Sequence, residues 1–206
     1  MWRVARFWDP PALDPSCVRV YGNDAFCLVL QQKLGLELCS PSDELIFDVP
    51  AQHLRRAIWR RTLGEMADLS YPTFCKPVTP KLFSARVYAS AAELAAECRG
   101  LDGQTVVLAS EPVAFAAEAR CFVLEGAVLD CAIYEGDADA AAAAAAAADL
   151  LRDVRVPRAI VLDMGLIPGR GWALVELNAA WGAGLNGCRP ELVWPCVAAA
   201  SGPQPC

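Results

Sequence analysis

Two carboxylates and an amide, Asp163, Glu176 and Asn178, are spaced so that they could share one metal ion. Oxygen ligands of this kind are those that a hard cation such as Mg²⁺ takes in proteins. Two carboxylates that face each other across a strand pair repel unless a cation lies between them. If a metal ion alone relieves that repulsion, replacing either acid by its amide should leave the metal-free protein as stable as before or slightly more stable.

A β-hairpin over residues 159–178 would place these three side chains on one face of a sheet. Apolar and β-branched residues fill 160–162 and 172–177, and the sequence Pro-Gly-Arg-Gly separates the two runs. A two-residue turn of type II′ at 169–170 predicts that Asp163 lies opposite Glu176. Asn178 follows two residues later and therefore shares the face of Glu176.

The alternative interpretation is a surface hairpin whose charges face water, because short patterns of this kind are individually weak. The second strand is apolar on both sides of its polar residues, at Leu174, Val175, Leu177, Ala179 and Ala180. Such a strand is typically buried on both faces, and a buried acid needs a partner. This flanking sequence favours a metal or nucleotide site.

The earlier part of the candidate site supplies three cations that complement these acids, namely Lys76, Lys81 and Arg120. The same part of the sequence also contains Glu111 and Glu118. A polyphosphate held by Lys and Arg and bridged to carboxylates by Mg²⁺ would use all of them. The sequence has no phosphate-loop signature, no dinucleotide-binding glycine signature and no kinase catalytic loop.

Composition limits the function classes. The chain has 206 residues, 55% of them hydrophobic, which excludes wholesale disorder, and its net charge of −6 argues against a nucleic-acid partner. Its ten cysteines contain no Cys-x-x-Cys pattern and His53 is the only histidine, so neither a zinc site nor a disulfide framework is indicated. No run reads as a secretion signal or a membrane span. We expect a soluble, cytoplasmic protein with reduced cysteines and no membrane partner.

The remaining patterns predict alternating helices and strands. Four arginines (55, 56, 60 and 61) lie in the second expected helix, where they either contact phosphate or RNA or form a solvated face. A run of alanines predicts a surface spacer helix, and the C-terminal tail is expected to fray. Strands are expected at 18–21, 36–38, 82–88, 105–109, 118–124 and 127–134, and helices at 24–34, 52–66, 90–98, 140–152 and 190–200.

The ordered set of polar residues resembles the ATP-grasp superfamily over roughly residues 70–200. Lys76, in Phe-Cys-Lys-Pro, resembles the nucleotide-binding lysine of the lid, and the linker from Glu111 to Val113 resembles the segment that reads adenine. Glu118 resembles the acid that binds ribose. Asp163, Glu176 and Asn178 resemble the magnesium ligands.

Within that superfamily the chain is similar to the clade defined by one arginine and two lysines, which correspond to Arg120, Lys76 and Lys81. The resemblance implies an α+β ATP-grasp fold, with a small N-terminal α/β lobe and two α+β subdomains that grip the nucleotide between antiparallel sheets. It divides the chain into an N-terminal lobe (1–70), a core (71–200) and a tail (201–206). The core comprises a lid (71–110) and the central sheet with the metal hairpin (111–200).

The implied function is ATP- and Mg²⁺-dependent ligation, in which a carboxylate is joined to an amine through an acylphosphate. Arg120 and Lys81 would be catalytic, and the carboxylate and amine, which could belong to a peptide or protein, are not identified by the sequence. Two alternatives remain: a chaperone that binds ATP to dock a partner without turnover, and a degenerate nucleotide-binding fold. The lid departs from the family pattern, because Pro80 to Ser84, with Lys81, replaces the usual glycine-rich loop.

Overall fold

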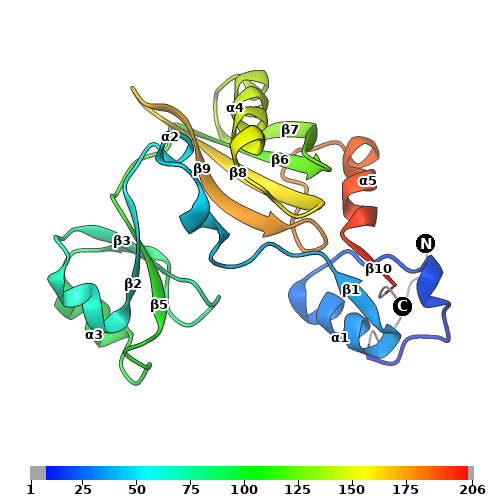
Figure 1. Ribbon diagram of the computed structural model, residues 1–206, viewed down its shortest axis with the longest axis horizontal. Helices are drawn as coiled ribbons and strands as arrows, with labels where there is room; N and C mark the ends of the chain where they lie inside the picture. The colour runs from blue at the N-terminus through cyan, green and yellow to red at the C-terminus, as the bar shows by residue number, and fades with distance from the viewer. Residues whose placement is uncertain (1–7, 204–206) are drawn as a thin grey trace.

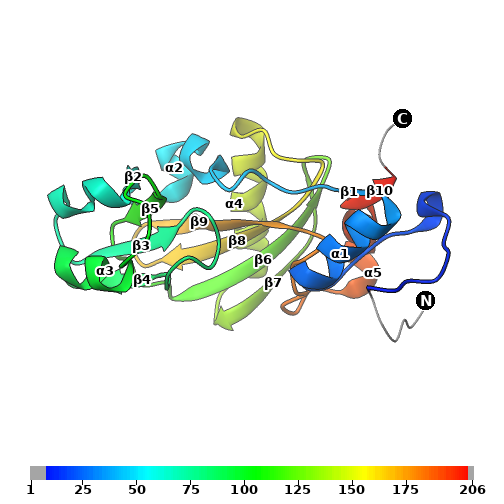
Figure 2. The same cartoon turned by 90° about the horizontal axis from the view of Figure 1, so that it is seen from below.

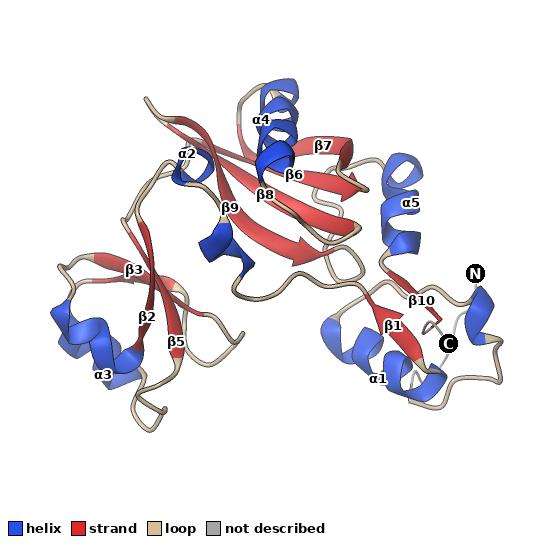
Figure 3. Cartoon of the chain, viewed as in Figure 1, coloured by secondary structure: helices blue, strands red, loops and turns tan. Residues whose placement is uncertain are grey.

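The computed structural model describes residues 8–203, which form three parts arranged in a row (Figure 1). A four-stranded lid sheet lies at one end, a second four-stranded sheet lies in the middle, and a small lobe that holds both ends of the described chain lies at the other. Figure 3 shows the helices and strands of each part. The 3-10 helices are η1 (Pro15–Cys17), η2 (Leu45–Asp48) and η3 (Leu63–Asp68).

The lid sheet contains β2 (Ile58–Thr62), β3 (Thr73–Pro77), β4 (Arg86–Tyr88) and β5 (Val106–Ser110). Its order is β2-β5-β3-β4, and every neighbouring pair is antiparallel. The helix α3 (Ala91–Glu97) is capped by Ser90, as the sequence predicts, and covers the sheet together with η3. Tyr88 and Leu94 lie in this small core, which makes the lid a folded unit with its own packing.

The central sheet contains β6 (Ala117–Leu124), β7 (Ala127–Gly136), β8 (Ala159–Ile167) and β9 (Gly171–Ala179). Its order is β7-β6-β8-β9, again antiparallel throughout. The two predicted hairpins are confirmed. One face of this sheet is covered by α4 (Ala140–Asp153) (Figure 2).

The alanine-rich helix α4 is confirmed as a helix, but its expected role as a surface spacer is wrong. Ala143, Ala147 and Leu150 are fully buried against the central sheet. Small side chains let the helix backbone approach the sheet closely, so the alanine run is part of the core. Its exposed alanines occupy the opposite side of the helix.

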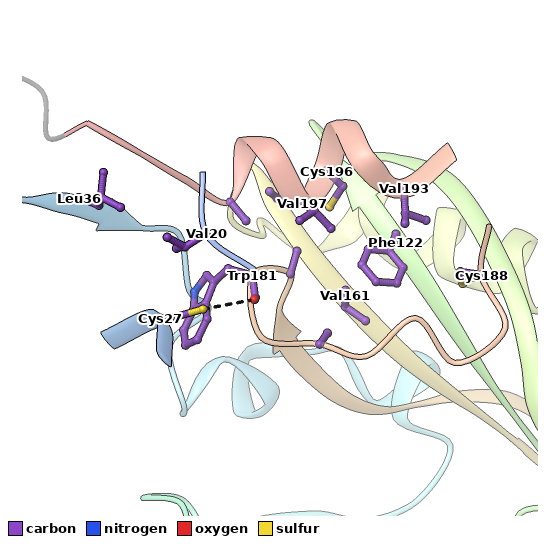
Figure 4. Close-up of a cluster of buried hydrophobic side chains, with 14 of the residues drawn as sticks. Val20, Cys27, Leu36, Phe122, Val161, Trp181, Cys188, Val193, Cys196 and Val197 are labelled. Atoms are coloured by element: carbon purple, nitrogen blue, oxygen red, sulfur yellow. Dashed lines mark hydrogen bonds between the residues drawn. The ribbon is translucent and has the colours of Figure 1, made fainter. Parts of the chain in front are cut away.

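The other face of the central sheet packs at one end against α5 (Pro190–Ala199) and the N-terminal lobe. Figure 4 shows Phe122 and Val161 of the sheet beneath α5, and Trp181 beside Cys27 of the N-terminal lobe. The Cys27 thiol donates a hydrogen bond to the Trp181 carbonyl over 3.8 Å. This shared core leaves the opposite end of the same face free for polar residues.

The N-terminal lobe contains α1 (Asp24–Leu34), β1 (Leu36–Leu38) and β10 (Ser201–Pro203). Asn23 caps α1, and Gly35 ends it at a positive φ of 63°, so both predicted helix boundaries are confirmed. The predicted strand at 18–21 is wrong, because the Val20 amide bonds to the Ser201 hydroxyl instead of a strand partner. Residues 201–203 pair with β1, so they are not frayed, and the rest of the predicted tail lies outside the described residues.

The predicted helix over 52–66 is also wrong. The chain forms one helical turn, α2 (Ala51–Leu54), then Arg55 takes a left-handed conformation with φ of 49°, and β2 follows. Pairing with β5 over Ile58–Thr62 explains the difference, since tertiary contacts override the weak helical propensity of this segment. The expected strand at 82–88 is shorter than predicted, because only Arg86–Tyr88 pairs with β3. Among residues 8–203, no helix is long and apolar enough to cross a membrane.

Candidate active site

The polar residues of the central sheet form a row across three neighbouring strands. Arg120 of β6 lies directly opposite Asp163 of β8, and Asp163 lies directly opposite Glu176 of β9. Glu118 and Asn178 lie two residues along β6 and β9 and so extend the same face. The face that packs on α4 carries the alternate, apolar residues of these strands.

Arg120 and Asp163 form a buried ion pair. The guanidinium Nε and Nη2 atoms donate to the two Asp163 oxygens over 2.8 and 2.7 Å, and the side chains are 12% and 5% exposed. The hydrogen bonds to Asp163 raise the pKa of Arg120. The remaining Nη1 donates to the Gly184 carbonyl over 2.8 Å, which attaches the glycine-rich loop after β9 to the site.

Asn178 links this pair to a second one. Its Nδ2 atom donates to Asp163 Oδ2 over 2.9 Å and to Glu176 Oε2 over 3.4 Å. The other Glu176 oxygen accepts a hydrogen bond from the Lys76 ammonium, which extends from β3 of the lid. A continuous chain of charges and hydrogen bonds, Arg120–Asp163–Asn178–Glu176–Lys76, therefore connects the central sheet to the lid sheet.

The expected pairing of the two acids is confirmed, but the predicted turn is wrong. Ile167 pairs with Gly171, so the loop has three residues, and the Arg170 amide bonds to the Ile167 carbonyl over 3.0 Å. Pro168 and Gly169, at a φ of 74°, occupy the central positions that a type II turn requires. A bulge after Asp163 adds one residue to β9, and this shift restores the pairing that a two-residue turn would give.

The predicted burial of β9 on both faces is wrong, and it is β8 that is buried on both faces. Asp163 is 4% exposed, whereas β9 lies at the sheet edge and most of its residues are half-buried. The Glu176 and Lys76 side chains are 40% and 35% exposed. The argument that a buried acid needs a partner thus applies to Asp163, whereas Glu176 is partly exposed to solvent.

The assumption that only a metal ion could relieve the repulsion between the two acids is also wrong. Arg120 and Lys76 already neutralise Asp163 and Glu176 within the protein. A cation would therefore join, or compete with, existing partners. This changes the expected effect of removing either acid.

Glu118 has a partner that the sequence did not indicate. The Tyr134 hydroxyl of β7 donates to Glu118 Oε2 over 2.6 Å, and the Arg120 guanidinium lies 5.9 Å from the centre of the Tyr134 ring. Burial and the hydrogen bond to Glu118 raise the pKa of Tyr134, so the phenol stays protonated and donates. The predicted hairpin of β6 and β7 was the available signal, because it brings Tyr134 close to Glu118.

Lys81 is not gathered with the other site residues. It lies in the loop between β3 and β4, at a positive φ of 68°, and its ammonium donates to Asp24 Oδ2 over 2.9 Å. Both side chains are exposed, at 80% and 57%. The pair joins the lid to the first turn of α1. Gly182 of the glycine-rich loop lies beside the same acid, since a Cβ added there would be 3.7 Å from Asp24 Oδ1.

The linker from β5 to β6 holds Glu111 and Val113. Glu111 pairs through both carboxylate oxygens with Arg170 in the turn of the β8–β9 hairpin, at 2.7 and 3.1 Å. These hydrogen bonds, with one from the Ala57 amide, lower the pKa of Glu111. The Glu111 amide donates to the Ala57 carbonyl over 2.9 Å, so contact with adenine through this linker would fall to other residues, such as the half-buried Val113.

Two of the arginines expected on a helix also link the lid to the β8–β9 hairpin. Arg55 Nε donates to the Trp172 carbonyl over 2.8 Å, and Arg56 Nη1 donates to the Leu174 carbonyl over 2.7 Å. Burial lowers the pKa of Arg56 to about 10. Arg60 pairs with Glu44. The four arginines therefore do not form one helix face, and Arg55 and Arg56 fix the lid to the hairpin.

The donor set fits a magnesium ion. One oxygen of Asp163 and one of Glu176 lie within hydrogen-bonding distance of the same Asn178 nitrogen, and turning that amide would present its oxygen at the same place. Two carboxylates and an amide leave coordination positions for water or phosphate, as Mg²⁺ usually requires. Residues 8–203 hold no group of three or more His, Cys, Asp or Glu arranged for a metal ion, so no competing site of that composition is present there.

Four buried cysteines of the described chain show the expected structural role. Burial raises the pKa of the Cys27, Cys75, Cys188 and Cys196 thiols to about 11 in each case. A thiol with this pKa is a poor nucleophile at neutral pH. These four residues therefore pack as small apolar side chains.

Comparisons with known proteins place the fold. The structure resembles a RimK domain protein ATP-grasp from Sphaerobacter thermophilus, with a TM-score of 0.54 and 16% identity over 76% of this chain and 62% of the other. It also resembles D-alanine--D-alanine ligase from Bacillus anthracis, with a TM-score of 0.52 and 11% identity over 76% of this chain and 64% of the other. The protein thus spans less than two thirds of either chain. A search of curated proteins gave no significant match.

At the level of sequence, residues 53–195 match an ATP-grasp domain family, namely family 2 of the clade named for one arginine and two lysines. The matched segment covers most of the chain, including the lid sheet, the central sheet and every residue of the candidate site. The α+β fold with two antiparallel sheets agrees with this match. The protein belongs to the ATP-grasp superfamily, within this second family of the one-arginine, two-lysine clade.

Proposed function

We propose that the protein is an ATP- and Mg²⁺-dependent ligase that joins a carboxylate to an amine through an acylphosphate. Family membership supports the general class, because ATP-grasp proteins are typically ATP-dependent carboxylate–amine ligases. The observation that carries the proposal is the chain Arg120–Asp163–Asn178–Glu176–Lys76. It concentrates two cations and two acids on the open end of one sheet face, next to the lid.

Each member of the chain has a proposed role in holding ATP and the metal ion. Asp163, Glu176 and Asn178 would hold Mg²⁺, which would neutralise charge on phosphate oxygens. Lys76 would bind the phosphates from the lid side, and Glu118 would accept a hydrogen bond from the ribose. Tyr134 keeps the Glu118 carboxylate oriented, and the linker with Glu111 and Val113 would contact adenine.

Arg120 and Lys81 would stabilise negative charge on the phosphoryl group as the substrate carboxylate attacks it. Arg120 is fixed in place by Asp163 and Gly184, so its guanidinium needs no reorganisation. Lys81 would leave Asp24 to reach a phosphate, because its present partner lies on α1. The exposure of this ion pair makes the exchange inexpensive in free energy. The amine would then open the acylphosphate and release phosphate.

The test is release of ADP from Mg–ATP by the purified protein, with pooled amino acids, peptides and cell extract as sources of carboxylate and amine. A ligase releases ADP only when both substrates are present. The matched variants are Arg120→Lys, which keeps the charge but loses the forked contact with Asp163, and Arg19→Lys, an arginine of the N-terminal lobe outside the site.

We expect Arg120→Lys to lower turnover at least 10-fold and Arg19→Lys to leave it unchanged. ATP-dependent complex formation with a protein from the extract, without ADP release, would instead support the alternative of an assembly chaperone. Absence of any nucleotide binding would support a degenerate fold. Either result would refute the ligase proposal.

A further inference from the structure

Two cysteines face each other on the central sheet, on the side away from the candidate active site. Cys121 of β6 pairs directly with Cys131 of β7, so both side chains point to the same face. Cys121 Sγ lies 2.9 Å from Cys131 Sγ. Both are free thiols in the structure. The buried thiols of Cys27, Cys188 and Cys196 donate instead to backbone carbonyls.

The register of this pair is compatible with the Cα separation that a disulfide requires. Directly opposed residues of an antiparallel pair have Cα atoms about 4.5 or 5.5 Å apart. Disulfides span Cα separations of about 4.4–6.8 Å. The pair lies within a short segment of β6 and β7 that is bounded by a register shift on each side, after Glu118 and after Phe122. Small local adjustments are therefore possible without moving the rest of the sheet.

The two thiols differ in access. Cys121 is fully buried beneath α4, whereas Cys131 is partly exposed at the edge strand. The hydrogen bond that Cys121 donates lowers the pKa of Cys131 and raises that of Cys121. Cys131 is therefore the thiol that an oxidant reaches first, and Cys121 is positioned to resolve the product.

We propose that Cys121 and Cys131 form a reversible redox site that closes to a cross-strand disulfide on exposure to a small-molecule disulfide. The Cys131 thiolate attacks one sulfur of the reagent, a mixed disulfide forms, and one small thiolate leaves. Cys121 attacks the Cys131 sulfur and passes its proton to the departing small thiolate, which leaves as the second small thiol. Two protein thiols are oxidised and one reagent disulfide is reduced to two thiols.

The bond would tie the edge strand β7 to β6. β6 carries Glu118 and Arg120, and β7 carries Tyr134, the partner of Glu118. Closing the loop between the two cysteines restricts the unfolded chain and so stabilises the fold. Because the pair lies on the face opposite the site, the disulfide fixes the strands that hold these residues without entering the site.

The sequence offers a direct readout. Cleavage after Arg120 and Arg152 yields the peptide 121–152, which contains Cys121 and Cys131 and no other cysteine. The folded protein is treated with oxidised glutathione, denatured, alkylated with N-ethylmaleimide, digested and analysed by mass spectrometry. We expect the peptide to lose two hydrogen atoms and take up no label, and to take up two labels after dithiothreitol.

Two variants and one internal standard complete the experiment. The exposed Cys17 should form a mixed disulfide with glutathione, which shows that the reagent is active. Oxidation should raise the melting temperature by about 5 °C in the wild type. The same rise is expected in Cys39→Ser, a control at a half-buried cysteine outside the pair, and no rise is expected in Cys131→Ser. The proposal would be overturned if, while Cys17 is modified, peptide 121–152 of the wild type takes up two labels. It would also be overturned if Cys131 retains glutathione.

Discussion

Replacing Asp163 by Asn should destabilise the metal-free protein. Asp163 and Arg120 are 5% and 12% exposed and share two hydrogen bonds. Removing one partner of a buried ion pair typically costs about 3–5 kcal/mol. Asn keeps one acceptor oxygen for one of the two bonds, so we expect the lower end, about 3 kcal/mol. In a chain of this size that loss lowers the melting temperature by about 6–12 °C.

The assay is thermal and urea unfolding in the presence of a metal chelator. Glu176→Gln is the matched variant, since its ion pair with Lys76 is more than one third exposed on both sides; we expect a change below about 1 kcal/mol. The double variant Arg120→Gln/Asp163→Asn should lose less than the sum of the single changes, because the two residues share one interaction. An Asp163→Asn protein as stable as the wild type would refute the buried pair and restore the expectation of two acids held apart by metal alone.

Three further predictions concern residues around the site. Ala147→Leu should lower the free energy of unfolding by about 1–3 kcal/mol, because Ala147 is fully buried beneath the sheet. The control Ala145→Leu, at an exposed position, should change it by less than about 0.5 kcal/mol. Urea unfolding measures both, and equal effects would show that α4 is not packed on the sheet. Gly165→Ala should also cost about 1–3 kcal/mol by the same assay, since an added Cβ would collide with the Phe115 ring, and an unchanged midpoint would mean that the ring moves freely. Arg170 lowers the pKa of Glu111 from its ordinary value of 4.5, so the stabilising contribution of Glu111 is present above pH 4.5 and is lost as the pH falls through the lowered value. The difference in melting temperature between wild type and Glu111→Gln should therefore shrink below pH 4.5. A constant difference down to pH 3 would contradict this prediction.

The sequence predicted the pairing of Asp163 with Glu176 for a reason that was only partly right. The true loop has one residue more than the predicted turn, and a bulge on β9 compensates for it. A bulge leaves no reliable signal in a single sequence, because it is set by packing against neighbouring strands. The side-chain alternation of β6 was predictable, since an apolar and polar period of two is visible from Glu118 to Arg120.

The segment after residue 50 could not be predicted from local propensity. Its arginines and the spacing of Leu54, Ile58 and Leu63 favour a helix, yet Ile58–Thr62 gains a full antiparallel partner in β5. Arg56 is then held by the Leu174 carbonyl across the junction. Contacts of this range are absent from any short window of sequence. The same holds for Asp24, whose partner Lys81 lies on another element.

Calorimetric titration with ATP in the presence of Mg²⁺ tests the central assignment most directly. The wild type should give a saturable signal with one site, which disappears when the metal is chelated, and the fold should gain about 2.7 kcal/mol at 100 times the dissociation constant. Glu176→Gln, which keeps its fold, should bind Mg–ATP at least 10-fold more weakly, because it removes a proposed metal ligand. A folded wild type that shows no binding at millimolar Mg–ATP, or equal affinity in Glu176→Gln, would contradict the assignment of this row of residues as an ATP–magnesium site.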